Sequence, residues 1–159
     1  MRRVSAETRC RQARVPSIAW KIAAVVWALV IFHLSTSAYG PGLSGRLLAG
    51  ALSLLHLAIP VPRLEVLNHF ARKAAHLGEY AVLAVLLCAA SEEQPLQWRP
   101  QRVLACFLVV LAYSLTDEFH QRFVPGRNAS LADCGIDSIG GAMGVLVYHL
   151  NHLRLRAAE

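Results

Sequence analysis

Six acidic or imidazole side chains stand out because each lies in or beside a long apolar stretch of the chain. They are His76, Glu79, Asp117, Glu118, Asp133 and Asp137. Residues three or four apart share one face of a helix, so we expect His76 to face the same way as Glu79, and Asp133 the same way as Asp137. An ionised group inside a bilayer costs on the order of 2.5–3.5 kcal/mol unless it is paired or protonated, and such groups are usually functional. These residues therefore predict one polar site.

Catalysis is one chemistry that this set could support. The catalytic candidates are His76, Glu79, Asp117 and Glu118. Either His76 or Glu118 could act as general base on a lipid-linked ester or phosphodiester. His76, Glu79 and Glu118 are also an alternative set of ligands for a divalent metal. Because the sequence contains no HExxH motif, nucleophile elbow or phosphate-binding glycine loop, we expect no cofactor, and enzymatic activity stays an open alternative.

Binding of an anionic group is the second chemistry, because basic residues flank the acids. Arg72, Lys73, Arg122 and Arg127 could hold a phosphate, for which the arginine fork is well suited. Five carboxylates nearly balance these four bases and His76, and this near balance predicts that acids and bases of different helices form ion pairs. The predicted ligand-binding residues are Arg72, Lys73, His76, Tyr80, Asp117, Glu118, Gln121, Arg127, Asp133 and Asp137. A third hypothesis is that the cluster serves only to pack helices together.

The composition requires that apolar helices position this cluster. Of the 159 residues, 55% are hydrophobic and 16% are charged, which is too apolar for an ordinary soluble domain. The net charge of +6 suits nucleic acid or anionic lipid, and the apolar excess favours lipid over nucleic acid. We predict an all-α polytopic membrane protein whose four spans are 17–34, about 70–90, about 102–120 and 131–150. Residues 43–59 predict a further helix that lies in the interface or re-enters the membrane, ended by Pro60 and Pro62.

The distribution of bases predicts the orientation. Four spans put both ends of the chain on one side, together with ten of the 16 Lys and Arg residues, so we expect both termini in the cytoplasm. The polar cluster then lies in the outer leaflet. The expected organisation is a basic segment at 1–16, a transmembrane domain at 17–150 and a short tail at 151–159. The basic start and first apolar run also resemble a signal peptide, but the run is longer than the usual 7–15 residues.

Two segments resemble the signature blocks of the VanZ-like family of bacterial membrane proteins. Residues 72–87, RKAAHLGEYAVLAVLL, resemble the first block through Lys73, His76, Tyr80 and Leu83. Residues 113–144 resemble the second block, which is quite specific. The matching positions there are Asp117, Glu118, Gln121, Arg127, Asp133, Asp137 and Gly140. The chain departs from many relatives at Asp137, where they carry Asn.

The resemblance implies a multi-pass protein of the bacterial cytoplasmic membrane. The family is named for a protein associated with low-level teicoplanin resistance, so it also implies a role of that type in the cell envelope. The partner that we expect is therefore an anionic lipid head group or a cell-wall precursor. Gly140 and Gly144 form a GxxxG motif, which predicts a close-packing surface on the last span. The oligomeric state is not predicted.

Overall fold

The computed structural model describes residues 17–36, 41–91, 100–125 and 130–157. Within these ranges all regular structure is helical. The helices are α1 (Ser17–Leu34), α2 (Pro41–Leu54), α3 (Val61–Ser91), α4 (Pro100–Gln121) and α5 (Leu131–Ala157). Four of them, α1, α3, α4 and α5, are long and apolar enough to cross a membrane. The predicted all-α polytopic fold, with four spans and one additional helix, is confirmed.

The predicted boundaries fit some helices better than others. The first span matches α1, whereas α3 begins at Val61 and not near Phe70. Proline usually ends a helix, but Pro62 lies in the first turn of α3. The backbone N–H groups of a first turn have no acceptor within the helix, so a proline there costs no hydrogen bond. The amides of Arg63 and Leu64 both donate to the carbonyl of Pro60 and begin the helix. At the other end of the fold, α5 continues through most of the predicted tail to Ala157.

The additional helix, α2, ends earlier than the predicted boundary at Ile59. It is closed by a Schellman motif, in which the amide of Leu57 donates to the carbonyl of Leu52 at 3.0 Å and the amide of His56 to Ser53 at 3.0 Å. His56 takes the left-handed conformation, with φ of 57°, in the position that glycine usually occupies. Because the motif is built on a non-glycine residue, the sequence carried no signal for it.

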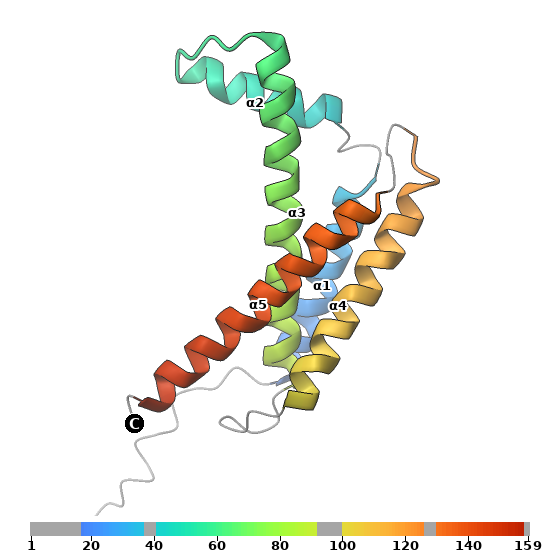
Figure 1. Ribbon diagram of the computed structural model, residues 1–159, viewed down its shortest axis with the longest axis vertical. Helices are drawn as coiled ribbons and strands as arrows, with labels where there is room; N and C mark the ends of the chain where they lie inside the picture. Colours follow the sequence, from blue (N-terminus) through green and yellow to red (C-terminus); the bar gives the residue numbers. More distant parts are fainter. Residues whose placement is uncertain (1–16, 37–40, 92–99, 126–129, 158–159) are drawn as a thin grey trace, which may run out of the picture.

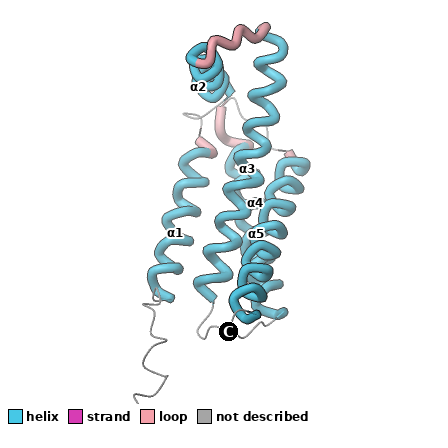
Figure 2. Tube along the Cα trace, turned by 90° about the vertical axis from the view of Figure 1, so that its left-hand side faces the viewer, coloured by secondary structure: helices cyan, strands magenta, loops and turns pink. Residues whose placement is uncertain are grey.

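The central helix of the fold is α3, which contacts each of the other four helices and packs most extensively on α5. In Figure 1, α2 lies across the N-terminal end of α3, and α5 crosses α3 diagonally. Figure 2 shows α3 between α1 and α5. The first residue of α1 and the last residues of α5 lie at the same end of the bundle, opposite to α2. This arrangement agrees with an even number of spans.

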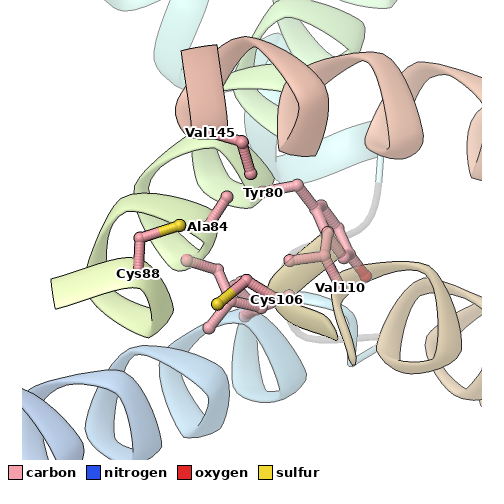
Figure 3. Close-up of a cluster of buried hydrophobic side chains, with 8 residues drawn as sticks. Tyr80, Ala84, Cys88, Cys106, Val110 and Val145 are labelled. Atoms are coloured by element: carbon pink, nitrogen blue, oxygen red, sulfur yellow. The ribbon is translucent and has the colours of Figure 1, made fainter. Parts of the chain in front are cut away.

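A compact apolar cluster fills the bundle below the polar residues. Its buried members come from α1, α3, α4 and α5 and include Tyr80, Ala84, Cys88 and Val110 (Figure 3). Cys88, Cys106 and Cys134 are buried and are not joined by disulfide bonds, which suits small apolar packing residues.

The contact between α3 and α5 depends on two glycines. A Cβ atom on Gly140 would overlap the backbone carbonyl oxygen of Leu77, and one on Gly144 would overlap that of Ala81. The two backbones therefore touch, as in close-packed membrane helices with small residues at the interface. Gly141, on the same helix, faces α4 instead, because a Cβ there would meet Val110 of α4 at 2.7 Å.

We expect Gly140→Ala to destabilise the protein by about 1–3 kcal/mol, because a rigid carbonyl cannot move aside as a flexible side chain can. The matched control is Gly135→Ala on the same helix, where an added Cβ meets nothing within 4 Å. That change should be neutral or stabilise by up to about 1 kcal/mol, since alanine favours helix. The unfolding temperature of each variant in detergent measures the effect, and equal values would contradict the proposed packing.

Candidate functional site

The outermost part of the polar cluster joins α3 to the beginning of α5. Lys73 Nζ lies 2.9 Å from Asp133 Oδ1, and both side chains are about one-third exposed. Arg72 is the neighbouring base on α3 and is half-buried. Its Nη1 atom is buried and has no hydrogen-bond partner among the described residues. One of the two bases is thus paired, and the other keeps an unused donor.

One turn deeper, a second interaction joins the same two helices. His76 Nδ1 lies 3.3 Å from Asp137 Oδ1, and Asp137 is completely buried. The other carboxylate oxygen of Asp137 accepts a hydrogen bond of 2.8 Å from the Ser114 hydroxyl on α4. Ser114 therefore holds Asp137, and Asp137 in turn faces the imidazole of His76.

Asp117 on α4 is the centre of a third group of interactions. Its Oδ2 atom accepts hydrogen bonds from Ser35 at 2.8 Å, from Gln121 at 3.1 Å and from Tyr80 at 3.4 Å. Ser35 follows α1 directly, so the first span also contributes to the cluster. The ring of Tyr80 belongs to the apolar cluster below (Figure 3). Its hydroxyl donates to Asp117 and thus links that cluster to the polar group.

Glu118 fixes the start of α5. Its Oε2 atom accepts a hydrogen bond of 2.7 Å from the backbone amide of Ser130. Ser130 caps α5, since its hydroxyl accepts from the amide of Ala132 and its carbonyl accepts from the amides of Asp133 and Cys134. Glu118 therefore helps to place both aspartates of α5.

Neutral donors replace many of the charge pairs that the sequence suggested. Asp117 and Glu118 are buried, and the hydrogen bonds described above come from hydroxyl, phenol and amide groups. Arg122 is exposed at the surface, and Arg127 lies outside the described residues. Asp117 Oδ1 and Glu118 Oε1 are buried without a hydrogen-bond partner in the described part of the chain. Asp117 and Glu118 are therefore stabilised by hydrogen bonds from neutral groups and not by the predicted network of ion pairs.

A cavity of about 740 Å³ opens beside this cluster. It is bounded by α2, by the first half of α3 and by the ends of α4 and α5 that meet them. Five of the predicted binding residues line it: Arg72, Lys73, His76, Gln121 and Asp133. Tyr80, Asp117, Glu118 and Asp137 are not part of its lining and are buried in the bundle. The structure therefore divides the predicted site into a cavity wall and a buried support.

Several cavity residues were missed in the sequence. Glu65, Asn68 and His69 continue the polar stripe of Arg72, Lys73 and His76 towards the start of α3. Their offsets of 0, 3, 4, 7, 8 and 11 follow the helical period, and that signal could have found them. Ser35 and Ser114 had no comparable signal, because a serine in an apolar helix usually bonds to its own backbone.

Glu79 does not join the buried carboxylates in a metal site. Its carboxylate attracts both Arg72 and His76, and its backbone carbonyl accepts a hydrogen bond of 2.9 Å from the indole of Trp27. Among the residues that the structure describes, no three His, Cys, Asp or Glu side chains are grouped so that they could hold a metal ion. The alternative ligand set of His76, Glu79 and Glu118 thus has no support in the geometry.

Together these features define a class: a multi-pass α-helical membrane protein with a cavity at one end of its bundle that is lined in part by charged side chains. The family model of VanZ/LLP1 matches residues 20–152. The chain therefore belongs to the VanZ/LLP1 family, as the two signature segments predicted. No curated protein and no solved structure matches the chain.

Ser114→Ala should lower the free energy of unfolding by about 1–3 kcal/mol, because it leaves a buried oxygen of Asp137 without its donor. Thr116→Ala is the matched control on the same helix. The Thr116 hydroxyl is exposed and donates to the carbonyl of Tyr113, so its loss should change stability by less than about 0.5 kcal/mol. Unfolding temperatures in detergent compare the two, and a larger effect at Thr116 would contradict the assigned bond.

Glu118→Ala should destabilise the protein by about 1–3 kcal/mol, because the amide of Ser130 loses its acceptor at the start of α5. Glu118→Gln keeps an oxygen acceptor and should lose less. Hydrogen exchange at the first turn of α5 measures the effect directly. Equal protection in the wild type and in Glu118→Ala would show that Glu118 does not hold this end of the helix.

Proposed function

We propose that the cavity binds the anionic head group of a membrane lipid or of a lipid-linked cell-wall precursor. A phosphate is the group that best suits its lining. Arg46, Arg72 and Lys73 contribute three positive charges, and Glu65 and Asp133 contribute two negative ones. Because Lys73 is paired with Asp133, the remaining net charge of +1 comes from the two arginines against Glu65.

The observation that carries the proposal is the unpartnered donor of Arg72. A buried guanidinium nitrogen without an acceptor among the described residues is costly, and because Arg72 lines the cavity, a rotation of its guanidinium group would bring this donor to an anionic oxygen there. His76 lines the same wall one turn further along α3 and could donate a second hydrogen bond. The volume of about 740 Å³ lies in the usual range for small-ligand sites, so a head group would fit.

Two carboxylates of α5, the buried Asp137 and the partly exposed Asp133, support this wall. Asp137 faces His76, and Asp133 holds Lys73, so both cavity residues are oriented by acids of α5. A cluster that only packed helices together would have no need of an open cavity with a free arginine donor. Likewise, no specific observation favours the enzymatic alternative.

The cellular setting is part of the same proposal. With both termini in the bacterial cytoplasm, the cavity would lie on the outer side of the cytoplasmic membrane, where cell-wall precursors are used. If the ligand is such a precursor, its capture would modulate the supply for wall synthesis. A glycopeptide-resistance phenotype of the kind implied by the name of the family would then follow from precursor binding.

The test is binding of phosphatidylglycerol to the purified protein, counted by native mass spectrometry. Arg72→Gln should weaken binding by about 10- to 100-fold, the equivalent of one charge-assisted hydrogen bond. Arg72→Lys should be intermediate, because lysine keeps the charge but loses the bidentate geometry.

Arg63→Gln is the matched control. Arg63 is exposed on the same helix and does not line the cavity, so its loss removes the same charge without affecting the site. Binding should then stay within about twofold of the wild type, as for a distant surface charge. Equal losses in Arg63→Gln and Arg72→Gln would reduce the effect to non-specific attraction, and unchanged binding in Arg72→Gln would reject the proposal.

A further inference from the structure

We infer that the outer face of the α2–α3 hairpin, residues 41–72, contacts lipid acyl chains, so that the cavity lies inside one leaflet of the bilayer. The first half of α3 has two faces of opposite character. The stripe from Glu65 to His76 that faces the cavity is polar. The exposed residues on the other side, from Val66 to Val82, are all apolar: Val66, Leu67, Phe70, Ala71, Ala74, Ala75 and Val82.

This pattern is the reverse of that in a helix at the surface of a soluble domain, which turns its apolar face inwards. Phe70 is 63% exposed and Val66 is 57% exposed. On this face of α3 the first charged residue towards the start of the helix is Arg63. Contact with acyl chains explains an apolar outer face and a polar inner one.

The lengths of the helices agree with this depth. From Arg63 to Ser91, α3 rises by about 42 Å, which matches a bilayer with its head-group regions at about 40–45 Å. α4 starts level with the end of α3, since Arg102 Nη1 donates to the carbonyl of Ser91 at 3.3 Å. Its 22 residues rise only about 33 Å. The end of α4 that borders the cavity thus lies below the start of α3, within the leaflet.

A second group of residues, on other elements, supports the same depth. Phe123 and Leu131 flank the connection between α4 and α5 and are 71% and 80% exposed. At the tip of the hairpin, Leu54 and Leu55 are 82% and 68% exposed. Exposed apolar side chains thus occur on several elements besides α3, as expected if lipid contacts this part of the protein.

The consequence for the ligand rests on the proposed function. A cavity inside the leaflet is reached by head groups that remain attached to their lipid tails. The ligand class is therefore an anionic lipid, and a water-soluble phosphate of the same head group should bind much less.

Photo-crosslinking tests the depth without any anionic ligand. Benzoylphenylalanine is introduced singly at Val66 or Phe70, and the protein is irradiated in nanodiscs of phosphatidylcholine. The exposed Val25 on α1 serves as the positive reference, and Arg154 near the end of α5 as the negative one. Mass spectrometry should find lipid adducts at positions 66 and 70 as abundant as at position 25. Loss of the adduct at both positions, with position 25 still reacting, would overturn the inference.

A competition experiment tests the ligand class. Glycerol 3-phosphate in large molar excess should leave phosphatidylglycerol bound to the wild-type protein. Displacement would overturn the lipid class while leaving the anion site intact. Conversely, adducts at positions 66 and 70 together with unchanged binding in Arg72→Gln would support the depth and reject the proposed function.

Discussion

The close approach of α5 to α3 is the constraint on which the polar site depends. Gly140 and Gly144 bring the backbone of α5 against the carbonyls of Leu77 and Ala81. Lys73 and His76 of α3 can reach Asp133 and Asp137 of α5 because the two backbones are this close. Both aspartates lie on the same helix as the glycines, up to eleven residues before them. Larger residues at the two glycine positions would separate the helices and both pairs together.

Burial explains the arrangement of the remaining carboxylates. Inside a bilayer, polar groups must find their hydrogen-bond partners within the protein, since the hydrocarbon core contains no water to supply them. Asp117 finds them in the hydroxyl of Ser35, which follows α1, and in phenol and amide groups of α3 and α4, and Glu118 finds one in the backbone amide that precedes α5. These acids lie behind the cavity and position its wall. Among the described residues, Arg72 keeps an unpartnered donor and belongs to the cavity wall, whereas the unpartnered oxygens of Asp117 and Glu118 belong to residues outside the lining.

The polarity of α3 connects the cavity with its surroundings. A single helix carries a polar stripe on the side of α2 and an apolar face on the opposite side. The short helix α2 completes the wall of the cavity, and the Schellman motif at His56 turns the chain back so that the two helices can pack. The site therefore depends on α2, a short helix that is not itself one of the four spans.

The amino-acid sequence by itself determined the all-α membrane fold, the four spans and the family, because long apolar runs and motif spacing are local properties of the chain. It also indicated that His76, Asp117, Glu118 and Asp137 belong to one region. The tertiary structure decided which of them line the cavity and which support it, and it added Ser35, Ser114 and the cavity face of α2. Helical periodicity reports the face of a residue on its own helix. Which helix lies beside that face, and at what height it crosses, follow only from packing, and these two features decide the contacts that join the helices of the site.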